Sequence, residues 1–295
     1  MLSIGTCCVL HSPFQHSPFQ HSTFQHSNIQ HSTFNIAKMK AFILAAGLGT
    51  RLKPWTETHP KALVPVAGVP MLERVIMRLT EQGFNSITIN VHHFSSQIID
   101  FLQGKDFGAE ITISDETGNL LDTGGGLLAA STFLGADSRP FLVHNVDILS
   151  DAPLADIMAG HVDSGRDVSL VTSPRESSRK LLFNESGNLC GWHNLKTGEY
   201  RPEDFIPCAN LSERAFSGIY VVNPSMFSVL SGYADRIGSR KFPVMDFLLD
   251  SIKKYDIGEI ELKRLNLIDI GKPETLLQAQ QLLNENGALL YGCGC

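Results

Sequence analysis

Short apolar runs alternate with stretches of helical periodicity between residues 39 and 146. The runs Ala41–Ala45, Ile87–Val91 and Phe141–Val146 predict buried strands, because consecutive apolar residues suit a strand that is covered on both faces. Between them, apolar residues three and four positions apart, as in Val69–Gln82, predict helices that bury one face. This alternation is typical of an α/β fold with an open, mostly parallel sheet, whose ligands bind at the carboxyl ends of the strands.

The second half of the chain has a less regular pattern. Strands are expected at Val168–Thr172 and Ala215–Val222, with a hairpin at the Glu185–Asn188 turn ahead of Trp192. The remaining expected elements are helices at Gln97–Leu102, Leu127–Phe133 and Val244–Ile252, a helix from Pro273, and strands at Ile111–Ser114, Glu259–Leu265 and Leu267–Ile270, of which the last two return to the sheet. The patterns together predict a Rossmann-like sheet with helices on both faces and a smaller α+β elaboration.

The first 38 residues differ in composition from the rest. From His11 to Asn35 a five-residue unit recurs as HSPFQ, HSPFQ, HSTFQ, HSNIQ and HSTFN. A five-residue step turns ~140° around a helix, so the phenylalanines form no stripe, and we expect a disordered tail. Its histidines leave a metal-binding tail as the alternative, and Met39 is an alternative start. We expect one domain at 39–288, with halves at 39–150 and 151–288, and a loose tail at 289–295.

Composition and charge argue against several classes of protein. The net charge of −6 and the pI of about 6.0 disfavour binding to nucleic acid or to an anionic membrane surface. No apolar run approaches the ~20 residues of a membrane span, and no Lys or Arg precedes Lys38, as a secretory signal would require. The six cysteines lack C-x-x-C spacing, so we expect a cytoplasmic protein.

A loop of small residues, LAAGLGTR at Leu44–Arg51, follows the first predicted strand directly. Such a loop lets backbone N–H groups approach a triphosphate, and Arg51 offers a forked cation to the same phosphates. A tight turn without a ligand is the alternative. Leu52 stands where a dinucleotide fingerprint needs glycine, and the P-loop pattern is absent. The nucleotide-binding residues predicted in this loop are Ala45, Ala46, Gly47, Gly49 and Thr50.

Lys61 stands in a proline-rich loop, PKALVPVAGVP, that begins at Pro60. A rigid loop here can hold Lys61 toward the same phosphates, although a surface lysine is the alternative. At this point the chain resembles the sugar-1-phosphate nucleotidyltransferase family, whose signature is close to L-A-A-G-x-G-T-R-L followed by P-K-x-L-x-P-V. The resemblance covers residues 40 to about 285. In detail it is similar to short bacterial N-acetylmuramate-1-phosphate uridylyltransferases and to mannose-1-phosphate guanylyltransferases.

Asp147 and Asp269 each stand at the end of a predicted strand, on the edge of the sheet where ligands bind. Taken alone, each is well explained as a strand-end cap. The family resemblance assigns both carboxylates to one Mg²⁺, which neutralises the triphosphate. The family's N-G-D segment is N-V-D in this chain, with Val146 in place of glycine.

The same resemblance implies further contacts on both sides of the site. Thr123, Gly124 and Gly125 would lie against the nucleobase, although a helix amino terminus also requires glycines there. Asn90, at the end of the second strand, is a further candidate for nucleotide binding. The residues that the resemblance places beside the sugar are Asn145, Ser217 and Gly218, with Lys241 on the sugar 1-phosphate and a solvated lysine as the alternative for Lys241.

The resemblance implies an enzyme that joins a sugar 1-phosphate to UTP or GTP by in-line attack on the α-phosphorus, with pyrophosphate leaving. Arg51, Lys61 and Lys241 would hold the phosphates, so that positioning and charge neutralisation supply most of the rate. A glycosyltransferase of similar architecture and a catalytically silent regulatory homologue stay open, although the intact charged residues argue against both. We expect a monomer or small homo-oligomer whose partners are its two substrates.

Overall fold

The first strand, β1 (Met39–Leu44), lies inside the central sheet, and all six of its residues are buried. It pairs in parallel with β4 (Phe84–Val91) on one side and with β6 (Phe141–Asn145) on the other, and β5 (Glu110–Asp115) lies parallel to β4. The computed structural model describes residues 39–208 and 210–285. The parallel sheet that the apolar runs predict for the first half is therefore confirmed.

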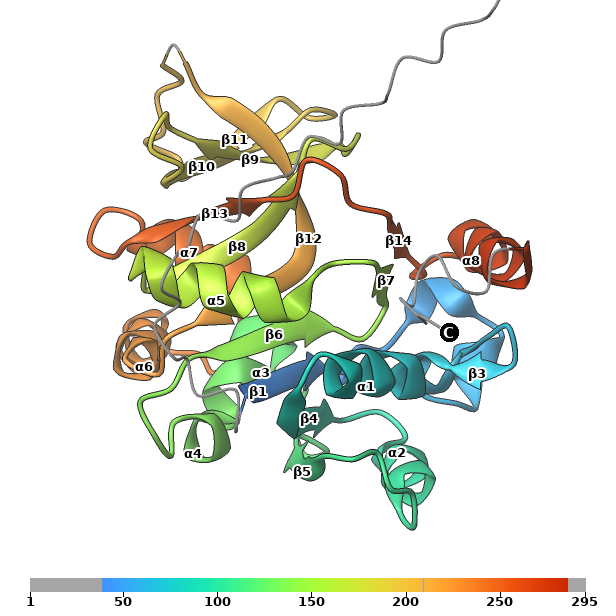
Figure 1. Cartoon of the computed structure of the whole chain (residues 1–295). Helices are drawn as coiled ribbons and strands as arrows, with labels where there is room; N and C mark the ends of the chain where they lie inside the picture. The colour runs from blue at the N-terminus through green and yellow to red at the C-terminus, as the bar shows by residue number, and fades with distance from the viewer. Residues whose placement is uncertain (1–38, 209, 286–295) are drawn as a thin grey trace, which may run out of the picture. The chain divides into compact units, whose positions relative to one another are not determined.

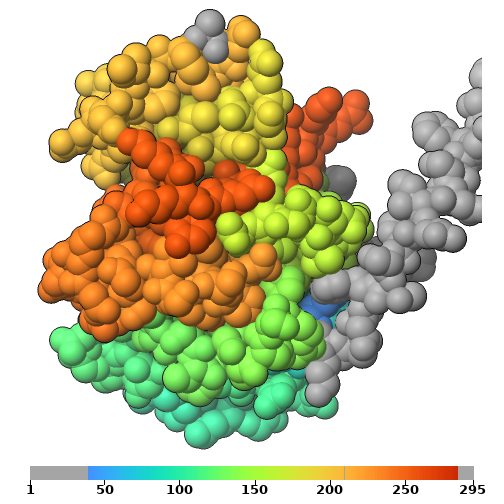
Figure 2. All heavy atoms as spheres, turned by 90° about the vertical axis from the view of Figure 1, so that its left-hand side faces the viewer, coloured from blue at the N-terminus to red at the C-terminus, as the bar shows by residue number. Residues whose placement is uncertain are grey.

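The second half of the chain continues the same sheet with antiparallel strands. β12 (Ser212–Val222) pairs with β6, with β8 (Val168–Ser173) and with β9 (Arg179–Phe183), so this one strand joins the two halves. β9, β10 (Leu189–Asn194) and β11 (Glu199–Arg201) form the expected hairpin and one further strand. In Figure 2 their yellow and gold residues lie above the orange residues of α6 and α7.

Helices cover both faces of the sheet (Figure 1). On the near face lie α1 (Met71–Glu81) and α5 (Leu154–Ser164), and α3 (Asp122–Ala129) lies behind the sheet. α3 packs against α6 (Met226–Ile237) and α7 (Val244–Ser251), and their apolar side chains form one core with those of β1, β6 and β12. The remaining α-helices are α2 (Ser95–Leu102), α4 (Ser131–Leu134) and α8 (Pro273–Glu285). No helix in the described ranges is long and apolar enough to span a bilayer.

The strand at the end of the chain differs from the expectation. The sequence predicts that Leu267–Ile270 returns to the main sheet, and this is wrong, because β14 (Leu267–Asp269) pairs with β7 (Ile148–Ser150) in a separate two-stranded sheet. The physical reason is that β6 already has a partner on each edge, so the returning chain meets only the short strand that follows it. β13 (Ile257–Glu261), by contrast, joins the main sheet beside β8, although it begins and ends earlier than predicted.

The described residues belong to one compact unit. The expected tails at residues 1–38 and 289–295 lie outside the described residues. The division of the domain into halves at residue 150 stays a prediction.

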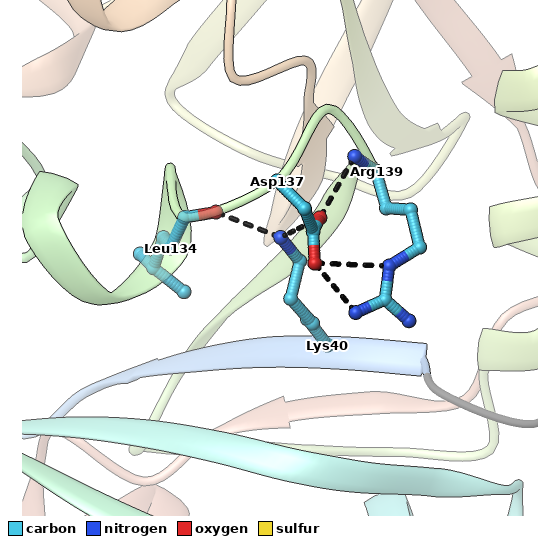
Figure 3. A network of polar contacts seen from close by, with 4 residues as sticks. All are labelled: Lys40, Leu134, Asp137 and Arg139. Carbon is cyan, nitrogen blue, oxygen red and sulfur yellow. Dashed lines mark hydrogen bonds and ion pairs between the residues drawn. The ribbon is translucent and has the colours of Figure 1, made fainter.

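A buried lysine ties β1 to the loop before β6 (Figure 3). The Lys40 ammonium donates to the Leu134 carbonyl oxygen at 2.8 Å and to Asp137 Oδ1 at 2.7 Å, although Lys40 is only 5% exposed. Hydrogen bonds from the Arg139 side chain, then from Lys40, hold the pKa of Asp137 well below its usual value. Because a buried ammonium is costly without partners, this network stabilises the centre of the sheet.

Asp137→Asn removes the counter-charge of Lys40 and should lower the free energy of unfolding by about 1–2 kcal/mol, since Asp137 is only partly buried. The pKa of Asp137 is lower in the folded state than in the unfolded state. The stability difference from wild type should therefore be fully present above pH ~4 and should shrink as the pH falls from there toward the lower pKa of the folded state. Urea unfolding at pH 7 and at pH 3 measures both effects.

The matched control is Asp235→Asn, at the exposed Arg240–Asp235 pair. It should change the free energy of unfolding by less than about 0.5 kcal/mol. Equal losses in the two variants would mean that the buried position of Lys40 is not what makes Asp137 matter.

Candidate active site

The loop after β1 is held in place by the amide side chain of Asn90, on the neighbouring strand β4. The backbone N–H groups of Ala45 and Ala46 donate to Asn90 Oδ1 at 2.6 and 3.2 Å, and Asn90 Nδ2 donates to Glu116 Oε1 at 2.8 Å. Burial raises the pKa of Glu116, despite the hydrogen bond from Asn90. Gly126 is needed beside this network, because a Cβ there would lie 2.6 Å from Glu116 Oε1. The sequence predicts that Asn90, Ala45 and Ala46 bind the nucleotide. In the structure the Asn90 side chain binds the backbone of Ala45 and Ala46 and so positions the loop.

The two glycines of this loop differ in what surrounds them. Gly49 has a φ of +62°, and a Cβ there would come within 2.8 Å of the Lys61 Cβ, so the turn and its packing both require glycine. Gly47 has no neighbouring atom within 4 Å of a built Cβ, and both Gly47 and Leu48 are exposed. Packing therefore explains Gly49, whereas the space over Gly47 is open to a ligand.

Lys61 and Asp147 form an ion pair across 86 residues of sequence. Lys61 begins the short helix η4 (Lys61–Leu63), where Pro60 fixes the preceding backbone. The two side chains are only 13% and 16% exposed, so solvent weakens their attraction little. The proline loop thus places Lys61 beside Asp147, just after the end of β6, and its contact with phosphates stays a prediction.

Asp269 and Arg51 both lie beside Gly271, which is on the segment that follows β14. The Ile270 N–H donates to the Asp147 carbonyl oxygen at 2.9 Å, which joins the end of β14 to the turn that follows β6. Asp269 Oδ1 accepts from the Gly271 N–H, and a Cβ on Gly271 would lie 2.7 Å from this oxygen and 2.6 Å from Arg51 Nη2. The structure therefore brings both predicted carboxylates, each beside a predicted cation of the first half, to adjacent segments joined by this hydrogen bond, and we call the four residues the charged cluster. It consists of Arg51, Lys61, Asp147 and Asp269.

Val146, which replaces the glycine of the family pattern, is part of the buried core. Its side chain is buried, and its N–H donates to the Leu44 carbonyl oxygen at 3.1 Å. The backbone before Asp147 thus continues the pairing between β6 and β1 for one more residue.

A cleft of about 620 Å³ extends from Asp269 between the β9–β11 strands and α7. The predicted residues Thr123, Asn145, Ser217 and Gly218 all line it. Gly218 has a φ of +77°, and a Cβ there would lie 2.9 Å from Asn145 Nδ2, so glycine lets β12 approach the end of β6. The pairing of β12 with β8 is irregular between Phe216 and Tyr220, which is where these residues lie.

The cleft is also lined by residues that the sequence analysis did not predict. Paired positions of the three hairpin strands line it in two rows, first Leu181, Trp192 and Arg201, then Arg179, Asn194 and Glu199. The Arg201 guanidinium lies 5.1 Å from the Trp192 ring and pairs with Glu199 and Asp246. Arg175 and Ser177 complete this wall. Alternate residues of a strand lie on the same face, so this alternation could have predicted the two rows once the strands were known.

The first turn of α3, which contains Thr123–Gly125, packs against the segment before α7. The N–H groups of Gly124 and Gly125 donate to the Phe242 carbonyl oxygen at 2.9 and 3.3 Å, and Thr123 Oγ1 accepts from the Val244 N–H. A Cβ on Gly125 would lie 2.0 Å from the Arg240 carbonyl oxygen. These glycines therefore have a packing role, and their contact with a nucleobase stays a prediction.

Lys241 lies in this segment and is exposed. It is not among the residues that line the cleft, although its neighbours Pro243 and Val244 are. Its side chain is thus the one predicted cation that lies apart from the charged cluster and the cleft wall.

The chain is similar to proteins of known kind. Residues 40–286 match the model of the family described as Nucleotidyl transferase. The chain is 30% identical over 243 residues to the mannose-1-phosphate guanylyltransferase catalytic subunit beta of Drosophila melanogaster. This match covers 81% of this chain and 61% of the relative. It is also 30% identical over 247 residues to a mannose-1-phosphate guanyltransferase of Schizosaccharomyces pombe, covering 81% and 62%. The chain thus spans about three fifths of the length of these curated relatives.

Solved structures share the fold. HddC from Yersinia pseudotuberculosis, complexed with GMP-PN, has a TM-score of 0.63 and 22% identity, and the match covers 82% of this chain and 98% of that one. A putative glucose-1-phosphate thymidylyltransferase from Bacillus anthracis has a TM-score of 0.67 and 19% identity, covering 83% and 94%. The Rossmann-like sheet flanked by helices is therefore a fold that these proteins have in common.

Asn90→Ala should lower the free energy of unfolding by about 2–4 kcal/mol, because it leaves two backbone donors and the Glu116 carboxyl group without their buried partner. The exposed Asn119→Ala is the control and should change stability by less than about 0.5 kcal/mol. Chemical denaturation of both variants checks the prediction, and a loss below about 1 kcal/mol for Asn90→Ala would contradict it.

Proposed function

This chain belongs to the nucleotidyl transferase family, and on that basis we propose that it transfers a nucleotidyl group from a nucleoside triphosphate to a sugar 1-phosphate. The observation that carries the proposal is that Asp269 of the charged cluster lines a cleft large enough for a sugar. Arg51 lies beside Asp269, and a backbone hydrogen bond from Ile270 joins this segment to Asp147, which pairs with Lys61. The names of the relatives favour GTP as the nucleotide and mannose 1-phosphate as the acceptor.

The triphosphate is proposed to lie over the exposed part of the loop, Gly47–Thr50. The N–H groups of Ala45 and Ala46 already donate to Asn90, so these two residues support the loop from within. The open space over Gly47 would let a phosphate approach the backbone, as cradles of backbone N–H groups do. Arg51, just beyond, would then neutralise the phosphates that leave as pyrophosphate.

The carboxylates of the cluster suit a divalent cation. Mg²⁺ is commonly held by one or two carboxylates together with substrate phosphates and water. Asp147 and Asp269 offer such a pair, and no group of three or more His, Cys, Asp and Glu within residues 39–208 and 210–285 competes with it. The Lys61 ammonium on Asp147 shows that this carboxylate already faces a cation. When bound there, Mg²⁺ would offset phosphate charge and polarise the phosphoryl oxygens.

The proposed reaction is a single displacement. An oxygen of the sugar 1-phosphate attacks the α-phosphorus, and the bond from that phosphorus to the bridging oxygen of pyrophosphate breaks. Lys61, held between the loop and the end of β6, would lie on the α-phosphate, where negative charge is redistributed in the transition state. No side chain has to take up a proton or form a covalent intermediate. The protein would contribute alignment of the two substrates and fixed positive charge.

The cleft beyond Asp269 is proposed to hold the sugar. Asn145, Ser217 and Gly218 line it where β6 and β12 meet, and Trp192 offers an apolar wall. The base is proposed to lie near the start of α3, at Thr123, Gly124 and Gly125, of which Thr123 also lines the cleft.

A matrix of sugar 1-phosphates against the four nucleoside triphosphates, read by pyrophosphate release, tests the function. Guanylyl transfer predicts the highest rate with GTP and mannose 1-phosphate. Transfer of a sugar from a nucleotide sugar, without pyrophosphate release, would instead indicate a glycosyltransferase. The absence of turnover with every pair would indicate a catalytically silent homologue.

Asp147→Asn and Asp269→Asn should each abolish most pyrophosphate release while leaving the melting temperature within a few degrees of wild type. Each removes one negative charge from the proposed cation site without changing the shape of the side chain. Titration with magnesium at fixed substrate concentrations checks the prediction. Near-normal turnover of either variant at saturating magnesium would show that its carboxylate is not a ligand.

Lys61→Ala should lower kcat by about 100- to 1000-fold, the range that follows loss of one charge-stabilising donor. The KM for the nucleotide should change less, because the charge of Lys61 matters most in the transition state. Steady-state kinetics with each substrate varied in turn separates the two constants. Lys105→Ala, which breaks the exposed Lys105–Glu73 pair, is the matched control and should leave both unchanged.

A further inference from the structure

Arg175 lies in the wall of the cleft, with both its side chain and its main chain held in place. It belongs to the loop between β8 and β9. Its Nη2 donates to the Phe216 carbonyl oxygen at 2.6 Å, and its own carbonyl oxygen accepts from the buried Lys180 ammonium at 2.9 Å. The guanidinium is therefore fixed beside the irregular stretch of β12 that carries Ser217 and Gly218.

This guanidinium has no carboxylate bound to it. Arg175 takes part in none of the ion pairs formed within the described part of the chain, and its Nε is buried without a hydrogen-bond partner. Arg201, in the same cleft, is by contrast neutralised by Glu199 at 2.7 Å and by Asp246 at 3.1 Å. A partly buried cation that lacks such a partner is costly unless an anion binds to it.

A carboxylate of the charged cluster acts on Arg175. Burial lowers the pKa of Arg175, and the carboxylate of Asp269 opposes that change. Asp269 also lines the cleft. Arg175 is thus a cation of the sugar cleft that faces the end where the nucleotide is proposed to react.

On the basis of the proposed function, we propose that Arg175 binds the phosphate group of the sugar 1-phosphate and directs it toward the nucleotide. The acceptor phosphate has to lie between the sugar cleft and the α-phosphorus, because one of its oxygens is the nucleophile. Arg175 stands at that junction, and a guanidinium can donate two parallel N–H groups to one phosphate. Lys241, which the family resemblance assigns to this phosphate, is exposed and does not line the cleft.

Binding can be measured without turnover, because the chain has two tryptophans and one of them, Trp192, lies in the cleft. In a Trp55→Phe background, the fluorescence of Trp192 should report titration with mannose 1-phosphate. Arg175→Ala should raise the dissociation constant for mannose 1-phosphate by about 10- to 100-fold, the effect of losing a charged hydrogen bond. Arg175→Lys should show a smaller increase, since an ammonium keeps the charge but lacks the fork. Circular dichroism establishes that each variant is folded.

The matched control is Arg236→Ala, which removes an exposed arginine paired with Asp250 on α6 and α7 and should leave the dissociation constant unchanged. Unphosphorylated mannose should bind equally weakly to wild type and to Arg175→Ala. In steady state, Arg175→Ala should raise the KM for the sugar phosphate more than the KM for GTP.

An unchanged dissociation constant in Arg175→Ala, with a large increase in Lys241→Ala, would assign the phosphate to Lys241 and overturn the proposal. Wild-type turnover combined with that result would leave the proposed function intact. Failure of the wild type to bind or to turn over any sugar 1-phosphate would overturn both.

Discussion

The parallel pairing of β1 with two neighbours at once is the constraint on which the rest of the structure depends. Leu44, the last residue of β1, lies opposite Asn90 of β4 and opposite Asn145 of β6. Because parallel strands run in the same direction, the segments that follow all three ends must emerge on one edge of the sheet. The glycine loop, the Asn90 amide and Asp147 are neighbours for this reason, although they are far apart in sequence. The buried Lys40 network secures the opposite end of β1.

Part of the charged cluster is buried, and burial strengthens the electrostatic interactions of its charges. Lys61 and Asp147 are mostly shielded from solvent, so water weakens the attraction between their charges little. Asp269 and Arg51 approach them from a separate ladder and from the loop after β1. Balanced charges of this kind remain stable without substrate. They would also present two cations and two carboxylates to phosphates and a divalent metal, which is what the proposed reaction requires.

The second half of the domain forms most of the wall of the cleft with a different kind of structure. An antiparallel hairpin presents alternate side chains to the cleft, so its wall can be changed residue by residue without altering the sheet. Trp192 and Arg201 form a part of this wall in which the charge of Arg201 is neutralised by Glu199 and Asp246. Arg175, close to the charged cluster, keeps its charge unneutralised by any described carboxylate. The proposed division between sugar and phosphate follows from this difference between two arginines of one cleft.

The sequence by itself determined the parallel half of the fold and the charged residues that end its strands. Buried strands and amphipathic helices leave strong local periodicities, and the loop and lysine motifs are contiguous, so Arg51, Lys61 and Asp147 could be predicted together. Only the tertiary structure decided that β14 pairs with β7 rather than with the main sheet, because β6 already had both edges occupied. It also decided that Gly125 makes room for the segment before α7, and that Arg175 lies in the cleft without a counter-ion. Those facts depend on which distant segments meet, and no local pattern of residues records such contacts.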